Sequence, residues 1–187
     1  MPNPSYPSRY GAVAQAFHWI IVALIVAQFI LANLADGLPL GAHKLALLAR
    51  HKSIGMTVLM LSLVRLLWRL KNPPPPLPAG MSAFERLLAR ATHIAFYALL
   101  FAMPITGWLM SSAKNYSVSW FGWFTWPNLI AKNESAFEWL RSTHDFLSGV
   151  LFSIALLHIA AALKHHFWNK DDVLLRMLPF HKSEKGP

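Results

Sequence analysis

Four long apolar stretches dominate the pattern of hydrophobic and polar positions along the chain. They cover roughly residues 12–35, 53–70, 92–111 and 146–164. Each contains about 18 to 24 residues, and at ~1.5 Å per residue each can cross a hydrocarbon core of about 30 Å. The pattern therefore predicts an all-α integral membrane protein, a four-helix bundle forming one domain over residues 1–187, with a tail at 165–187.

Two of the predicted connections are distinctive. The segment 71–91 contains four prolines from Pro73 to Pro76, which favour a stiff, extended spacer. The segment 112–145 is the longest predicted loop. Its aromatic side chains are of the kind that settles at the headgroup level of a membrane, and they are Trp120, Phe121, Trp123, Phe124 and Trp126.

Basic residues predict the orientation of the bundle. Eleven of the 17 Lys and Arg residues fall on the side that carries both termini and the proline segment. Cytoplasmic loops are enriched in these residues, so both termini are predicted to be cytoplasmic. Residues 1–10 lack a clustered basic region, and no clear cleavage site follows them, so we do not expect a signal peptide.

Composition narrows the chemistry. Hydrophobic residues make up 55% of the chain and charged residues 13%, against about 25% charged in soluble domains. The chain has no cysteine, which excludes disulfides, c-type haem attachment and thiolate-bound iron–sulfur clusters. The net charge of +9 is explained by residues flanking the spans, so we expect no nucleic-acid partner.

Histidine is the remaining candidate for redox or metal chemistry, and the chain has nine. His144 and His158 lie on the fourth span, 14 residues apart. This spacing is just under four helical turns, so both side chains project from nearly the same face, about 21 Å apart along the axis. Two metal centres at two depths would use that face.

Depth then predicts a partner for each of these histidines. His18 lies near the cytoplasmic side, as His158 does, and His51 lies at the outer side, as His144 does. Two facing imidazoles at each level suit six-coordinate haem iron. His93 shares the cytoplasmic level and is open to two interpretations, as an alternative ligand of the inner haem or as a quinone contact.

The other histidines and two glycines have simpler interpretations. We expect the histidines near span ends to be interfacial residues, and these are His43, His165, His166 and His181. Gly55, one turn after His51, and Gly11, two turns before His18, leave room either for a flat macrocycle or for close helix packing.

Several segments together resemble the bacterial cytochrome b561 family, small di-haem proteins of the inner membrane related to cytochrome b subunits of hydrogenases and formate dehydrogenases. The matching segments are RYGAVAQAFHW (9–19), HKSIGM (51–56), LVRLLWRL (63–70) and ALKHHFWNKDDVLLRM (162–177). The resemblance implies two haems b per chain. Their axial ligands would be His18 with His158, and His51 with His144.

The resemblance also implies a function, that of a superoxide oxidase. Such a protein would pass electrons from periplasmic superoxide to ubiquinone in the lipid bilayer. Superoxide is an anion, so basic residues beside the outer haem would steer it inward. The candidates are Lys44, Arg50, Lys52 and Arg141. The alternative interpretation is that these charges pair with haem propionates or simply belong to the outer loops.

Two other functions stay open at this point. In one, the protein is an electron-transfer module that serves a separate dehydrogenase or periplasmic redox partner. In the other, histidines line a transporter for a divalent metal. Hard cations need carboxylates. No carboxylate lies within a predicted span, and Asp145 stands just before the fourth, which disfavours transport.

Overall fold

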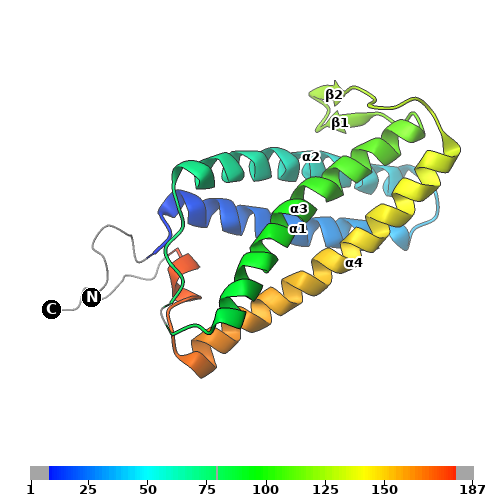
Figure 1. Cartoon of the computed structure of the whole chain (residues 1–187). Helices are drawn as coiled ribbons and strands as arrows, with labels where there is room; N and C mark the ends of the chain where they lie inside the picture. The colour runs from blue at the N-terminus through cyan, green and yellow to red at the C-terminus, as the bar shows by residue number, and fades with distance from the viewer. Residues whose placement is uncertain (1–8, 79, 180–187) are drawn as a thin grey trace.

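The structure, a computed structural model, describes residues 9–78 and 80–179 of the 187-residue chain. Within these residues, four helices are followed by two short helical turns, and one small antiparallel hairpin lies between the third and fourth helices (Figure 1). In chain order the elements are α1 (Ala12–Asp36), α2 (Ala42–Lys71), α3 (Ala83–Ala113), β1 (Val118–Trp120), β2 (Phe124–Trp126), α4 (Glu134–Lys164), a π-helical turn (His165–Asn169) and a 3-10 turn (Leu175–Met177). His181, Lys182 and Lys185 lie outside the described residues.

All four helices are long and apolar enough to cross a membrane, which confirms the predicted four-helix membrane bundle. Many large apolar side chains point outward: Ile94 and Leu157 are each 70% exposed and Phe146 is 69% exposed. Water would penalise such a surface, whereas lipid tails solvate it. The outside of the bundle is therefore built for a bilayer.

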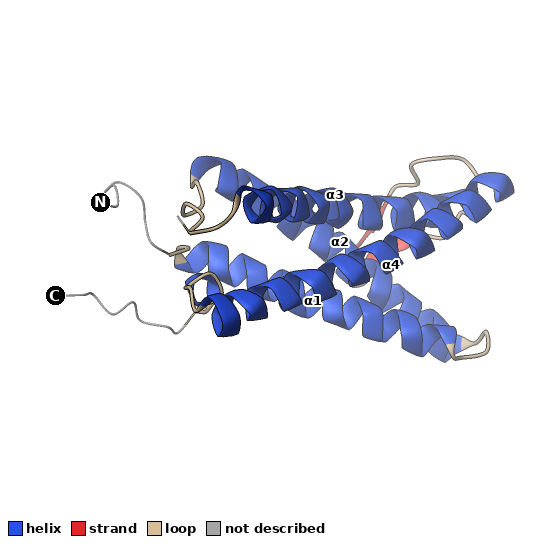
Figure 2. Ribbon diagram, turned by 60° about the horizontal axis from the view of Figure 1, so that its bottom comes forward, coloured by secondary structure: helices blue, strands red, loops and turns tan. Residues whose placement is uncertain are grey.

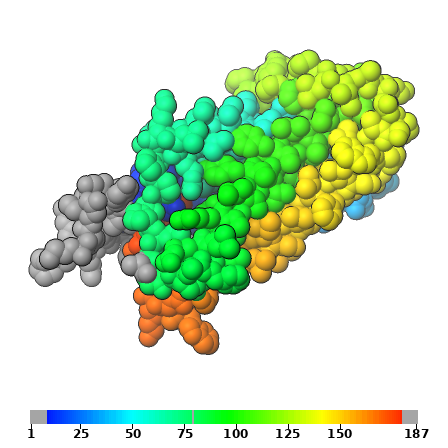
Figure 3. Space-filling view, viewed as in Figure 1, coloured from blue at the N-terminus to red at the C-terminus, as the bar shows by residue number. Residues whose placement is uncertain are grey.

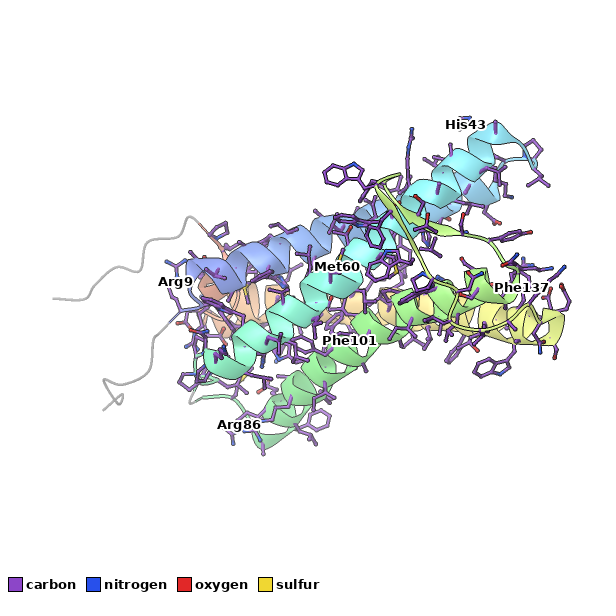
Figure 4. All side chains as sticks on the ribbon, turned by 90° about the horizontal axis from the view of Figure 1, so that it is seen from above. Arg9, His43, Met60, Arg86, Phe101 and Phe137 are labelled. Carbon is purple, nitrogen blue, oxygen red and sulfur yellow. The ribbon has the colours of Figure 1, made fainter. Side chains whose placement is uncertain are left out.

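The helices run up and down between two ends of the bundle. The terminus end holds the start of α1, the proline segment and the residues after α4, and the hairpin end holds the β1–β2 hairpin (Figure 1). Arg9 and Arg86 mark the terminus end, and His43 and Phe137 mark the hairpin end (Figure 4). A side chain on any helix can thus be assigned to one of two ends.

The bundle consists of two helix pairs. α1 packs along α2, α3 packs along α4, and contacts between α2 and α3 join the pairs. α4 crosses over α1 when the bundle is viewed as in Figure 2, and α3 runs beside α4 along the face seen in Figure 3. A small core of Ile21, Val58 and Leu100 lies where α1, α2 and α3 meet.

The helices extend beyond the predicted apolar spans, so the predicted connections were too long. α2 begins at Ala42 instead of 53, α3 at Ala83 instead of 92, and α4 at Glu134 instead of 146. A search for continuous apolar stretches misses these extensions because they mix polar and apolar residues. Side-chain caps mark the starts of two of these helices: Ser82 and Glu85 form a capping box for α3, and Asn133 caps α4.

The β1–β2 hairpin folds back along α2. The Ser53 hydroxyl lies 2.9 Å from the carbonyl oxygen of Ser119 and accepts a hydrogen bond from the amide of Phe121 at 3.1 Å. The indole of Trp120 donates to the hydroxyl of Thr57 at 3.1 Å. The left-handed backbone at Phe121 and Gly122 makes the turn. The aromatic loop is therefore an ordered part of the bundle, attached just after His51.

The segment after α4 is docked against the terminus end. The indole of Trp19 donates to the carbonyl of Met177 at 2.9 Å, and the amide of Gln15 donates to the carbonyl of Arg176 at 3.0 Å. The guanidinium of Arg176 donates in turn to the carbonyl of Pro76 at 2.6 Å. These bonds tie α1, the proline segment and the described part of the tail together.

Candidate functional site

Three histidines meet in the half of the bundle nearer the terminus end, and we call them the histidine trio: His18 on α1, His93 on α3 and His158 on α4. The ring centroids of His18 and His158 are 6.5 Å apart, and those of His93 and His158 are 6.1 Å apart. The ring of Phe96 packs edge-on against His158 at 5.3 Å. The structure thus brings His18 and His158 together and leaves His93 equally close.

Two histidines meet in the half nearer the hairpin end, and we call them the histidine pair: His51 on α2 and His144 on α4. Their ring centroids are 6.3 Å apart, with an angle of 71° between the ring planes. At each of the two depths, the α4 histidine therefore faces the partner that the depth argument predicted: His158 faces His18, and His144 faces His51.

The ring nitrogen Nδ1 has a different environment in three of these histidines. Nδ1 of His144 lies 3.0 Å from the hydroxyl of Thr106, whereas Nδ1 of His18 lies 3.3 Å from the guanidinium of Arg65. Nδ1 of His51 is buried and has no hydrogen-bond partner within the described part of the chain. Sequence reasoning missed Thr106 and Arg65 because neither is a metal ligand.

A glycine gives the histidine pair its space, but it is not one that the sequence singled out. A Cβ added to Gly107 on α3 would lie 3.3 Å from Cε1 of His144, so this position admits no side chain without moving the ring. At Gly55 a Cβ would lie 2.9 Å from the amide nitrogen of Gln28 on α1, which fits the helix-packing interpretation. Gly11 has open space around it.

The four basic residues proposed for steering differ in their surroundings. Arg50 and Arg141 are exposed, and the ammonium of Lys52 is partly buried over the ring of Tyr116 at 5.5 Å. Lys44 donates to the carbonyl of Leu38 at 3.0 Å. Arg50 and Arg141 are therefore the most accessible of the four.

Another cation at the hairpin end, Lys114, has a partner. It forms an ion pair with Glu134, and this hydrogen bond raises the pKa of the lysine. Its ammonium also lies 4.4 Å from the ring centroid of Phe137. The charge of Lys114 is therefore committed to holding the start of α4 near the end of α3.

The prediction that His165 is an interfacial residue was wrong. His165 is only 6% exposed, and its Nδ1 contacts both the carboxylate of Asp171 and the side chain of Asn169. Burial of the ring is possible because these two nearby polar side chains hydrogen-bond to it. His43 is exposed and His166 is half-buried, as expected near a helix end.

A cavity of about 30 Å³ lies at the terminus end beside the histidine trio. Its lining includes Tyr10, Arg65, Arg69 and Tyr97. The guanidinium groups of Arg65 and Arg69 lie 5.9 and 5.8 Å from the centroid of the Tyr97 ring. The Tyr97 hydroxyl is buried without a hydrogen-bond partner among the described residues. This wall of the site is positively charged.

The geometry fits paired axial ligation of a metal held in a flat cofactor. Centroid separations of 6.3 and 6.5 Å suit one metal atom between two imidazoles, with metal–nitrogen bonds of about 2 Å. The absence of a side chain at Gly107 leaves room for the ring of His144, and the buried Nδ1 of His51 has no hydrogen-bond partner among the described residues. The fold and site define a membrane protein whose helices bring histidines face to face at two depths, an arrangement typical of proteins that carry electrons.

Comparison with known proteins gives the family. The family described as Prokaryotic cytochrome b561 matches this chain over residues 9–180. Cytochrome b561 homolog 2 of Escherichia coli (strain K12) is 40% identical over 187 residues, 96% of each chain, and a probable superoxide oxidase, CybB of Yersinia pestis, is 29% identical over 171 residues, 91% of this chain and 96% of the relative. The chain belongs to the prokaryotic cytochrome b561 family of electron-transfer proteins. It is a multi-pass protein of the bacterial inner membrane, and its family implies haem b.

Proposed function

We propose that this protein is a superoxide:ubiquinone oxidoreductase that holds two haems b. His18 and His158 would be the axial ligands near the terminus end, and His51 and His144 those near the hairpin end. The observation that carries the proposal is the pair of histidine contacts at two depths of α4, at 6.5 and 6.3 Å. A chain of two carriers spans more of a bilayer than one carrier does.

Superoxide as the electron donor is supported by charge and by a relative. The positive-inside rule puts the hairpin end on the periplasmic side. Arg50 and Arg141 are exposed there, one directly before His51 and the other one turn before His144. Exposed cations raise the encounter rate of a small anion. The relative from Yersinia pestis is named a probable superoxide oxidase.

The proposed reaction balances without another reactant. Two superoxide ions each lose one electron and leave as dioxygen. One ubiquinone accepts both electrons together with two protons and becomes ubiquinol. Haem b, when bound, supplies an iron that takes up and gives up one electron at a time. The protein contributes the axial imidazoles, the positive rim and an apolar exterior that admits ubiquinone from the lipid.

Ligand replacement tests the cofactor assignment. We expect two noncovalent haems per chain in the pyridine haemochrome assay, and one in either His158→Ala or His51→Ala, because a bis-imidazole site that loses a ligand binds haem poorly. Two haems retained in both variants would show that the assigned ligands are wrong. One haem in the unmodified protein would remove one of the two sites.

Stopped-flow absorbance tests the donor. When superoxide is mixed with the purified protein, the haem should become reduced, and superoxide dismutase should abolish this reduction. Added ubiquinone should then reoxidise the haem. Reduction only by a purified dehydrogenase or periplasmic partner, with none by superoxide, would instead identify the protein as an electron-transfer module.

A further inference from the structure

The hydroxyl of Thr106 favours one of the two nitrogens of His144 as the one that carries hydrogen. This hydroxyl lies 2.9 Å from the carbonyl oxygen of Met103, which can only accept, so the single hydroxyl hydrogen is used there. The Thr106 oxygen is therefore left to accept from Nδ1 of His144 at 3.0 Å. In this arrangement Nδ1 carries the hydrogen, and Nε2 keeps its lone pair for a metal. Donation from Nδ1 also makes the imidazole a more electron-rich ligand.

The histidine trio has the opposite kind of neighbour. Nη2 of Arg65 lies 3.3 Å from Nδ1 of His18, and a guanidinium has only donors. A neutral imidazole that binds metal through Nε2 has its hydrogen on Nδ1, so Arg65 cannot accept from it as Thr106 does from His144. The same guanidinium lines the adjacent cavity together with Arg69 and Tyr97. Its positive charge stays at this level of the bundle.

The remaining charges reinforce the contrast. Arg65 contacts His18, whose ring faces His158, and the ring of His158 also faces His93, so one guanidinium charge lies beside the whole trio. Each described carboxylate at the terminus end has another partner: Glu85 pairs with Lys164, Asp171 with His165 and Asp172 with Arg176. At the hairpin end, Asp145 follows His144 and Lys52 follows His51 in the chain, so one charge of each sign lies beside the histidine pair. The trio end is therefore the more positive environment.

We propose that Thr106 and Arg65 are positioning residues that order the two haem potentials, lower at the histidine pair and higher at the histidine trio. Oxidised iron carries one more positive charge than reduced iron. An electron-rich axial ligand stabilises the oxidised state, whereas a nearby cation destabilises it. Electrons that enter at the hairpin end then pass downhill toward the terminus end. This inference rests on the two haem sites of the proposed function and not on the identity of the donor.

Redox titration of the purified full-length haem protein, followed by absorbance, is the test. We expect two waves in the unmodified protein, with the higher one remaining in His51→Ala, which keeps only the trio site. Thr106→Val should shift only the lower wave to higher potential, and Thr106→Ser, which keeps a hydroxyl, should restore it. Arg65→Gln should shift only the higher wave to lower potential, and Arg65→Lys should shift it less.

Haem content, measured on the same samples, separates tuning from loss of structure. Loss of haem in Thr106→Val that Thr106→Ser does not rescue would contradict a role through the hydroxyl. A lower wave that persists in His51→Ala, or unmoved waves in both Thr106→Val and Arg65→Gln, would overturn the proposed order. Absence of reduction by superoxide would refute the donor while leaving this order intact, because electrodes and chemical mediators supply the electrons in the titration.

Discussion

Gly107→Ala is a minimal change that tests the geometry of the histidine pair. The added methyl carbon would lie 3.3 Å from Cε1 and 3.6 Å from Nδ1 of His144. The ring must then move by a few tenths of an ångström, away from the position in which it faces His51 and contacts Thr106. Such overpacking costs about 1 to 3 kcal/mol. If the cost falls on cofactor binding, the haem dissociation constant at this site rises roughly 5- to 150-fold.

The assay is haem titration of the purified protein, with absorbance and haemochrome readouts. Gly149→Ala is the matched control, because it makes the same substitution in a membrane helix, with nothing within 4 Å of the added carbon. We expect Gly107→Ala to weaken one of two haems and Gly149→Ala to weaken neither. Equal haem affinity in both variants would refute the idea that the bare backbone at Gly107 shapes the site.

Two further predictions concern His93 and the positive rim. His93→Ala should keep both haems and change at most the rate of reoxidation by ubiquinone; loss of one haem in this variant, with retention in His18→Ala, would make His93 the ligand. Arg50→Glu or Lys52→Glu should slow reduction by superoxide about 2- to 10-fold without haem loss, and the unmodified rate should fall as salt rises. A rate indifferent to both salt and charge reversal would exclude steering.

The sequence predicted what depends on distance along a helix axis. Four apolar stretches gave four spans, and counting residues gave the depths at which His144 and His158 meet histidines from other helices. Depth follows from a fixed rise per residue. It requires no knowledge of how one helix is rotated against another.

Rotation and local contacts could not be predicted in the same way. His93 lies as close to His158 as His18 does, because the faces of α1 and α3 are set by packing among all the helices. The contact of Thr106 with His144 joins α3 to α4 and has no sequence signature. The burial of His165 depends on a turn that brings Asp171 back toward it. These features arise only from tertiary structure.

The arrangement of the helices in two pairs has a consequence for assembly. His51 reaches across from the α1–α2 pair to His144 of the α3–α4 pair, and His18 does the same to His158. A cofactor bound between either set of rings would link one helix pair to the other. Ligands that bind only the folded state stabilise it by mass action. The supply of haem would therefore govern whether the two helix pairs stay together after membrane insertion. The protein's lifetime in the membrane would then report the availability of its cofactor.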